Sequence, residues 1–181
     1  VTVADEVYTY MRDQDGNDGE AVRVFGLYDG AVNQITISAL GTEYMSTRTA
    51  WNTDPKDDTS GMPITEEIWT SVITHEVAHA LATQIYNTQN PVLKSNGYPI
   101  EPGVSEYIAY FIQLATTRPE LRDEIVASFG DIGPFQYTEN LNPFKHFAHP
   151  HKFGVQAYLT NNMDWFHAAL RGEIRNDLAT F

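Results

Sequence analysis

The sequence predicts an α+β fold, in which a small, mostly antiparallel N-terminal sheet packs on one long helix and a helical C-terminal half follows. Residues 22–38 contain β-forming runs separated by turn residues, residues 65–86 carry the apolar periodicity of a helix, and the later pattern stays helical. A chain of 181 residues suits one domain. We therefore expect a single domain over residues 1–181, sheet-rich over about 1–60 and helical over about 63–181.

The expected strands lie in the first third of the chain. Residues 22–28 and 34–38 are rich in β-branched and aromatic residues, and Asp29 and Gly30 between them are a turn signal. A third strand is expected near residues 48–51. The long helix is predicted to pack on the sheet that these strands form.

The segment before these strands is ambiguous. Val3, Val7, Tyr10 and Met11 fit one face of a helix. Residues 13–20 follow as a turn-rich acidic loop, whose alternating acidic and amide residues resemble a calcium-binding loop. This loop lacks the glycine at the sixth position and the glutamate at the twelfth, so a solvated turn is the preferred interpretation.

Periodicity and capping signals place the helices. Thr65 is a suitable N-cap, and Glu66 and Glu67 suit the first turn of the longest helix. Pro119 stands at a permitted first-turn position of a later helix. Helices are expected at about residues 65–87, 104–115, 119–129, 152–160 and 164–176, with loops at 87–102 and 130–142.

Composition excludes several classes of function. The chain carries 24 acidic and 11 basic residues, and this net charge of −13 argues against nucleic acid or an anionic membrane as a partner. Cysteine is absent, which excludes disulfide scaffolds and thiolate metal sites. No apolar run suits a transmembrane segment. The missing initiator Met and the acidic surface lead us to expect a secreted or periplasmic protein, whose mature chain would have lost its signal peptide.

The most informative stretch is residues 75–79, which read H-E-V-A-H within the longest predicted helix. Residues four apart lie on one helix face, so His75 and His79 can aim their rings at one point. Imidazole nitrogen is a good ligand for a borderline cation such as zinc. Glu76 is placed to reach a metal-bound water and to remove its proton. The pattern therefore predicts a metal site.

Aliphatic neighbours strengthen this interpretation. Val72, Ile73, Val77 and Leu81 surround the motif, and uncompensated polar groups among such residues cost several kcal/mol. The alternative is a pair of core histidines satisfied by hydrogen bonds, with Glu76 in a salt bridge.

A third ligand must come from elsewhere in the chain. A further histidine downstream is excluded because its position is occupied by Ile85, and thiolates are excluded by composition. A carboxylate on the next helix remains, and Glu106 lies within that helix's apolar periodicity. Glu101 is the competing ligand, but Pro102 after it favours an extended conformation, so Glu106 is preferred.

The H-E-x-x-H motif followed by an acidic residue on a downstream helix resembles the gluzincin metallopeptidases, the group of thermolysin and the zinc aminopeptidases. The resemblance covers about residues 65–110. It implies a zincin-like fold with one Zn²⁺, whose ligands are His75, His79 and Glu106. It also implies that Glu76 is the general base.

Gluzincins use a tyrosine or histidine from a later segment to stabilise the developing oxyanion. The resemblance makes His151 the first candidate, because it precedes Gly154 at the spacing that a tyrosine has in the zinc aminopeptidases. Tyr158 is the second candidate, followed by His149 and His146.

The implied activity is that of a zinc-dependent metallopeptidase-like hydrolase, in which zinc-bound water, deprotonated by Glu76, attacks a peptide carbonyl. A peptide or protein substrate is the expected partner, with the strand edge at residues 34–38 as a possible binding surface. The alternative is a catalytically inactive zincin-like domain that binds metal as a structural or protein-interaction module. Tyr110 stands where thermolysin-like chains have an aspartate that orients a histidine, so the residue in that supporting role is not predicted.

Overall fold

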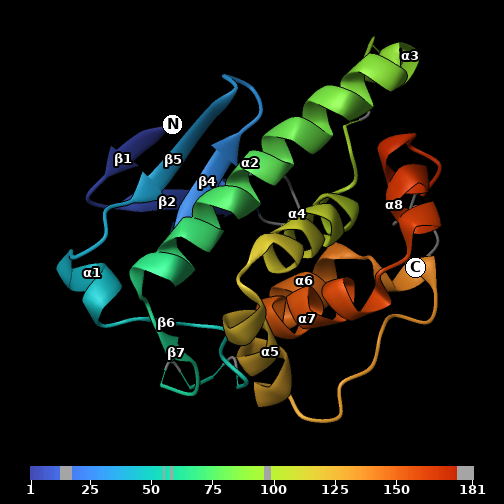
Figure 1. The fold of residues 1–181 in the computed structure, drawn as a ribbon. Helices are drawn as coiled ribbons and strands as arrows, with labels where there is room; N and C mark the ends of the chain where they lie inside the picture. The colour runs from blue at the N-terminus through green and yellow to red at the C-terminus, as the bar shows by residue number, and fades with distance from the viewer. Residues whose placement is uncertain (13–17, 55, 58, 96–98, 175–181) are drawn as a thin grey trace.

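Helix α2 (Glu66–Gln89) is the longest element of the structure, and it crosses one face of a three-stranded sheet (Figure 1). The computed structural model describes residues 1–12, 18–54, 56–57, 59–95 and 99–174. Small sheets near the N-terminus, followed by helices, confirm the predicted α+β fold. Within the described ranges, no helix combines the length and apolarity needed to cross a membrane.

The sheet under α2 has the strand order β1-β5-β4, with β1 at Thr2–Ala4, β5 at Gln34–Ser38 and β4 at Gly26–Asp29. β4 runs antiparallel to β5, whereas β1 runs parallel to it. The predicted turn after β4 is confirmed, because the Asp29 carboxylate accepts the N–H of Ala31 at 2.9 Å. β5 is the central strand, so the expectation of a free edge at residues 34–38 is wrong. β4 forms one border of this sheet.

A separate antiparallel ribbon consists of β2 (Val7–Arg12) and β3 (Asp18–Val24). The helical interpretation of residues 3–11 is therefore wrong: Val7 is buried and pairs with Val24 across the ribbon. Cross-strand pairing outweighs the weak helical spacing of these apolar residues. The strand expected at residues 22–28 is divided between β3 and β4. Residues 13–17, in the acidic loop, lie outside the described residues.

The third expected strand is present as β6 (Thr49–Ala50), but it pairs with β7 (Met62–Pro63) rather than with the main sheet. A short helix that the sequence analysis does not predict, α1 (Glu43–Ser46), precedes β6. Its N-cap is Thr42, whose hydroxyl accepts the N–H of Met45. This segment lies beside the N-terminal end of α2 (Figure 1).

From α4 (Pro102–Thr116) onwards the chain is mostly helical. The other four predicted helices are confirmed as α4, α5, α7 and α8, although their ends are shifted. The C-terminal helix is shorter in the described chain than expected, and α3 and α6 are not predicted. Proline stands in the first turn of several of these helices, where its missing N–H costs nothing. The elements are α3 (Pro91–Ser95), α4 (Pro102–Thr116), α5 (Pro119–Ser128), the 3-10 helix η1 (Thr138–Asn140), α6 (Pro143–Ala148), α7 (Pro150–Thr160) and α8 (Met163–Leu170).

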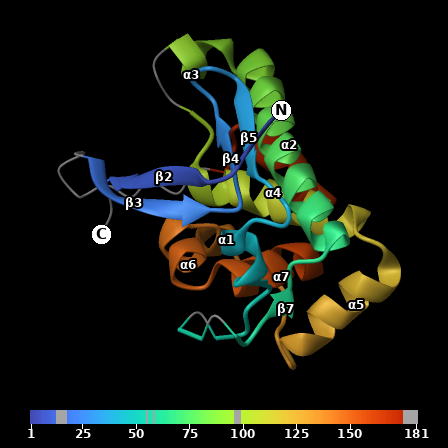
Figure 2. The same ribbon diagram turned by 90° about the vertical axis from the view of Figure 1, so that its left-hand side faces the viewer.

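Helix α4 lies between α2 and α7 and supplies much of the core (Figures 1 and 2). Tyr107 and Leu114 of α4 and Val155 of α7 have no exposed surface. α4 and α7 pack closely because position 154 is glycine: a Cβ there would lie 2.5 Å from Cδ1 of the buried Tyr110 ring. This packing fixes α4 relative to the helices on either side.

We expect Gly154→Ala to destabilise the fold, although alanine normally favours a helix interior over glycine by about 1 kcal/mol. The added methyl group overlaps the Tyr110 ring, and overpacking of this kind costs about 1–3 kcal/mol. Urea denaturation would measure the change in the free energy of unfolding. Gly133→Ala is the matched control, since nothing lies within 4 Å of its Cβ position. An equally stable Gly154→Ala variant would contradict the proposed clash.

Candidate metal centre

Two histidines of α2 and one glutamate of α4 point their side chains at a common space. The Nε2 atoms of His75 and His79 lie 3.0 Å apart. The Glu106 carboxylate lies 3.3 Å from His75 Nε2 and 3.5 Å from His79 Nε2. In the part of the chain that the structure describes, these three side chains form the group whose possible ligand atoms all lie within 4.8 Å of one another. The structure thus brings together the three residues that the sequence offers as ligands.

The spacing of these atoms suits a small tetrahedral ion. Zinc binds nitrogen and oxygen ligands at about 2.0–2.2 Å, which puts neighbouring ligands of a tetrahedron about 3.3–3.6 Å apart. The observed separations of 3.0, 3.3 and 3.5 Å are close to this range. Two imidazoles and one carboxylate are also a ligand set of catalytic zinc sites, which reserve the fourth position for water or substrate. The residues therefore fit zinc.

Hydrogen bonds on the far side of the His75 ring determine which nitrogen faces the centre. His75 Nδ1 lies 3.0 Å from Oε1 of Gln113, which can only accept, so Nδ1 carries the proton. The Gln113 amide donates to the Ser71 hydroxyl at 3.0 Å, and Ser71 donates to the Ile68 carbonyl at 2.7 Å. Nε2 of His75 is left with its lone pair free for a metal.

His79 contacts two neighbouring residues of α4, one of which is Glu106. His79 Nδ1 lies 2.7 Å from the hydroxyl of Ser105, the residue before Glu106. Burial alone would raise the pKa of Glu106, but His79 and hydrogen bonds to both histidines hold this pKa well below its ordinary value. Burial lowers the pKa of His79, yet the charge and hydrogen bond of Glu106 outweigh burial and raise it overall. The centre therefore holds an ionised carboxylate that favours a cation.

The side chain of Glu76 lies beside His75 and His79, where α2 faces β4. It is 8% exposed. Burial raises the pKa of Glu76, and the charges of His75 and His79 oppose this in part, as does a backbone hydrogen bond from Tyr28. A Cβ on Gly26 of β4 would lie 2.8 Å from Glu76 Cγ, so glycine allows the strand to approach this side chain closely. Glu76 is thereby fixed next to the two histidines.

His146 of α6 also reaches this centre. Its Nε2 lies 3.4 Å from Glu106 Oε2, and its ring packs edge-on against Phe153 with centroids 5.6 Å apart. Burial lowers the pKa of His146, although Glu106 opposes this. The sequence ranks His146 last among four candidates, because α6 is not predicted and nothing local separates His146 from His149 and His151. Only its contact with Glu106 identifies His146 as the histidine of this segment that reaches the candidate metal centre.

His151, the first candidate for stabilising an oxyanion, lies beside Trp51. The ring centroids are 5.7 Å apart, and His151 Nδ1 accepts the N–H of Asn52 at 2.9 Å. Burial, together with the nearby His146, lowers the pKa of His151 to about 4. Trp51 has a φ of 57°, which bulky residues rarely adopt, and its buried ring holds this conformation. His151 thus holds Trp51, and the Trp51 ring in turn packs against Tyr110 with centroids 5.9 Å apart.

The remaining sequence candidates lie elsewhere. Tyr158 sits on α7 with the guanidinium carbon of Arg122 5.6 Å from its ring centroid, and no described hydrogen bond or ring contact joins it to the ligands. His149 is the residue between α6 and α7, where it caps both helices. Glu101 is the N-cap of α4 and lies outside the described group of three donors. The geometry therefore favours Glu106 over Glu101.

Tyr110 lies one turn of α4 after Glu106 and packs against the first ligand. Its ring centroid is 4.5 Å from that of His75 and 5.9 Å from that of His146. Burial raises the pKa of Tyr110 well above its ordinary value, and the charges of Glu106 and Glu76 add to this. Tyr110 therefore remains a neutral phenol. By sequence spacing, Tyr110 stands where thermolysin-like chains have an aspartate that orients a histidine. In this structure Gln113 makes the hydrogen bond that orients His75.

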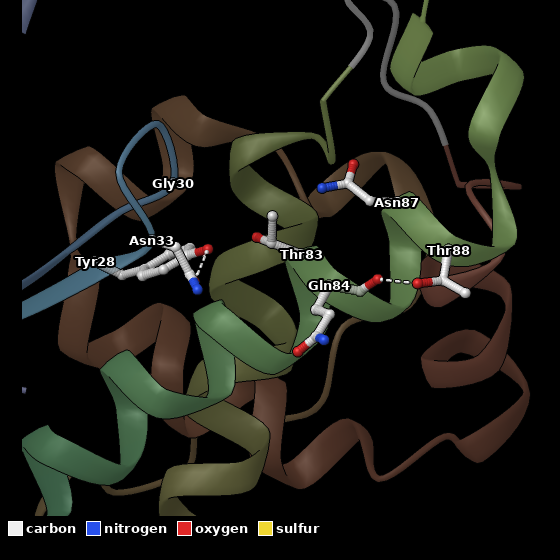
Figure 3. Close-up of a pocket in the computed structure, with 7 residues that line it drawn as sticks. All are labelled: Tyr28, Gly30, Asn33, Thr83, Gln84, Asn87 and Thr88. Carbon is white, nitrogen blue, oxygen red and sulfur yellow. Dashed lines mark hydrogen bonds between the residues drawn. The ribbon is translucent and has the colours of Figure 1, made fainter.

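A separate polar groove of about 280 Å³ lies between the β4–β5 turn and the second half of α2. Figure 3 shows Thr83 and Asn87 projecting from α2 on the side that faces Tyr28 and Asn33. Every lining residue is uncharged. Thr83 lies two turns beyond Glu76, about 10 Å along the helix axis. The groove is therefore distinct from the metal centre but lies on the same side of α2.

Comparison with known proteins gives one match. The model of a family described as "Family of unknown function (DUF6639)" matches residues 11–177 of this chain. No curated protein and no solved structure matches this chain.

We expect Gln113→Ala to weaken zinc binding by about 10- to 100-fold, because loss of such a supporting hydrogen bond frees the ligand ring. His75 would lose the acceptor at 3.0 Å that fixes its protonated nitrogen. Competition with a chromophoric chelator would measure the dissociation constant. Gln156→Ala is the matched control, since the Gln156 amide bonds only the Gly133 carbonyl on the far side of α7. Equal zinc affinity in wild type and Gln113→Ala would refute the role of Gln113.

We expect His151→Asn to reduce the loss of stability in acid. The pKa of His151 is about 4 in the folded protein against 6.5 in the unfolded chain. The unfolded chain therefore takes up this proton first, and stability present above about pH 6.5 is lost as the pH falls towards 4. Asparagine keeps an acceptor for the Asn52 N–H but does not titrate.

Urea midpoints of the metal-free protein between pH 4 and pH 7 would test this effect. The wild-type midpoint should fall more steeply with decreasing pH than that of His151→Asn. His167→Asn, at an exposed position of α8, serves as the control. Parallel curves for wild type and His151→Asn would show that His151 does not titrate in this way.

Proposed function

We propose that this chain, which belongs to the DUF6639 family of unknown function, is a zinc-dependent metallopeptidase-like hydrolase. The observation that carries the proposal is the convergence of His75, His79 and Glu106 at tetrahedral spacing, with the buried Glu76 beside them. A metal interpretation explains why two imidazoles and two carboxylates gather in one part of the interior. Such groups are costly to bury unless they share an ion or a proton.

Each residue has a defined task in this proposal. His75, His79 and Glu106 would hold zinc, which supplies Lewis acidity that lowers the pKa of water and polarises a carbonyl group. Glu76 is not a ligand; its carboxylate accepts the proton of the attacking water and later passes it to the leaving amine. Its fixed position between α2 and β4 keeps this carboxylate beside the reacting atoms.

The role first assigned to His151 fits His146 better. His146 Nε2 is 3.4 Å from a ligand oxygen, whereas the Nδ1 of His151 is engaged by the backbone of Asn52. His146 is therefore the residue of α6 that is placed to orient a substrate near Glu106. Instead, His151 ties α7 to the segment that carries Trp51 and Asn52.

The proposed substrate is an extended peptide. β4 borders its sheet and contacts Glu76 through Gly26 and Tyr28, so a substrate strand added to its outer edge would pass the catalytic carboxylate. Peptide residues further along would approach the uncharged groove at Thr83 and Asn87. Main-chain hydrogen bonds and neutral polar contacts would then provide most of the binding.

The alternative is a catalytically inactive domain with a structural metal. Structural zinc sites are closed by four protein ligands, whereas catalytic sites use three. In the described part of the chain, the group of mutually close donors has three members. The number of candidate ligands therefore favours a catalytic metal site, and with it the hydrolase, over a structural metal site.

We expect Glu76→Gln to retain zinc but to lose about 10²- to 10⁴-fold in turnover, because glutamine cannot accept the proton of water. Digestion of a peptide library by zinc-loaded protein, with and without a chelator, would measure the activity, and elemental analysis would measure the metal. Glu67→Gln is the matched control on the same helix, since Glu67 is only partly buried and pairs with Arg118 at 2.9 Å.

Wild type should cleave only without chelator, and Glu67→Gln should match it. A Glu76→Gln variant as active as wild type would remove Glu76 as the base. A zinc-loaded wild type that cleaves no peptide in the library would defeat the peptidase proposal.

A further inference from the structure

The hydroxyl of Tyr110 is a buried polar group that has no assigned task. Tyr110 is 8% exposed, and its hydroxyl makes no hydrogen bond within the described part of the chain. In that same part, every fully buried side-chain nitrogen or oxygen has a hydrogen-bond partner. The Tyr110 oxygen is therefore not sealed in the core, and it reaches space open to solvent or ligand.

The surroundings of the ring place this opening at the metal centre. His75 lies on one side with ring centroids 4.5 Å apart, and Trp51 and Phe153 pack at 5.9 and 6.4 Å. Glu106 stands one helical turn earlier on the same face of α4. Trp51, Phe153 and Gly154 cover other parts of the ring, which leaves the side of His75 and Glu106 for the opening at the hydroxyl.

The ring is also held rigidly. Gly154 leaves no spare room beside it, since even a Cβ would lie 2.5–2.9 Å from three of its carbons. His146 closes another side with ring centroids 5.9 Å apart. A donor fixed in this way needs no reorganisation when charge develops nearby, which is the requirement for stabilising an oxyanion.

We propose that the Tyr110 hydroxyl donates a hydrogen bond to the substrate carbonyl oxygen as this oxygen gains negative charge, which makes Tyr110 a catalytic residue. The inference rests on the proposed hydrolase function and assigns a donor within it. Tyr110 keeps its proton throughout, and no bond to the phenol forms or breaks. The donor comes from the helix that carries Glu106, whereas the sequence resemblance implies one from a later segment.

Tyr107 and His151, the alternative donors on α4 and α7, are already engaged. The Tyr107 hydroxyl donates to the Asn162 carbonyl at 3.4 Å, and His151 Nδ1 accepts from Asn52. His146 contacts Glu106, so it can act together with Tyr110 on the same substrate group. Among these side chains, Tyr110 is the one with a free neutral donor at the centre.

Tyr110→Phe tests the inference because it removes only the hydroxyl. We expect kcat to fall by about 10²- to 10³-fold, with KM and zinc content unchanged. The affinity of the zinc-loaded protein for a phosphinic peptide, which resembles the tetrahedral intermediate, should fall by a similar factor in calorimetry. Tyr107→Phe is the matched control on α4, and its kcat should stay within about 2-fold of wild type.

The outcomes separate this inference from the proposed function. An active wild type with undiminished kcat and inhibitor affinity in Tyr110→Phe would overturn the role of Tyr110 alone. Loss of zinc in Tyr110→Phe would make Tyr110 a support for His75 and would also overturn it. A wild type that neither cleaves peptides nor binds the phosphinic peptide would overturn both proposals.

Discussion

One buried carboxylate sets the arrangement of the centre. Glu106 carries a negative charge into the packed contact between α2 and α4, where an unpaired charge would cost several kcal/mol. Two imidazoles within 3.5 Å share that charge and lower its pKa. The cost of burial is offset only while α2 and α4 keep their present register. Helix packing and the ligand geometry therefore depend on each other, and a cation at the centre would stabilise both.

A second layer of contacts keeps these ligands in place. Gln113 fixes the His75 ring from behind, and Ser105 fixes the His79 ring. Neutral side chains join α2 to α4 at these two contacts, and a small residue lets α7 approach α4. Gly154 admits the Tyr110 ring, which in turn supports His75. The described side chains that support His75 and His79 from behind are therefore uncharged.

The sequence predicted the parts of this site that depend on local spacing. His75 and His79 are four residues apart on one helix, so their convergence follows from spacing alone. Glu106 was preferred over Glu101 from the periodicity of the next helix, and the packing of α4 on α2 brings it to the two histidines. His146 lies on a six-residue helix among three histidines, and only the packing of α6 distinguishes it. The central position of β5 depends on pairing with a strand at the N-terminus, which local pattern does not reveal. Similarly, the position of the Tyr110 ring beside His75 depends on the packing of α4 against α2, which local pattern does not reveal.

The choice between a catalytic and a structural metal depends on what completes the coordination. His146 is the nearest additional histidine, and its 3.4 Å contact is with the Glu106 oxygen that also faces His75. It does not join the described group of mutually close donors, so it contacts one of the three candidate ligands without completing the set. A structural site would draw this ring in as the fourth ligand. In the proposed hydrolase, His146, Tyr110 and Glu76 would instead stand around a fourth position left open for a reacting carbonyl and a water molecule, because each lies next to one of the three candidate ligands.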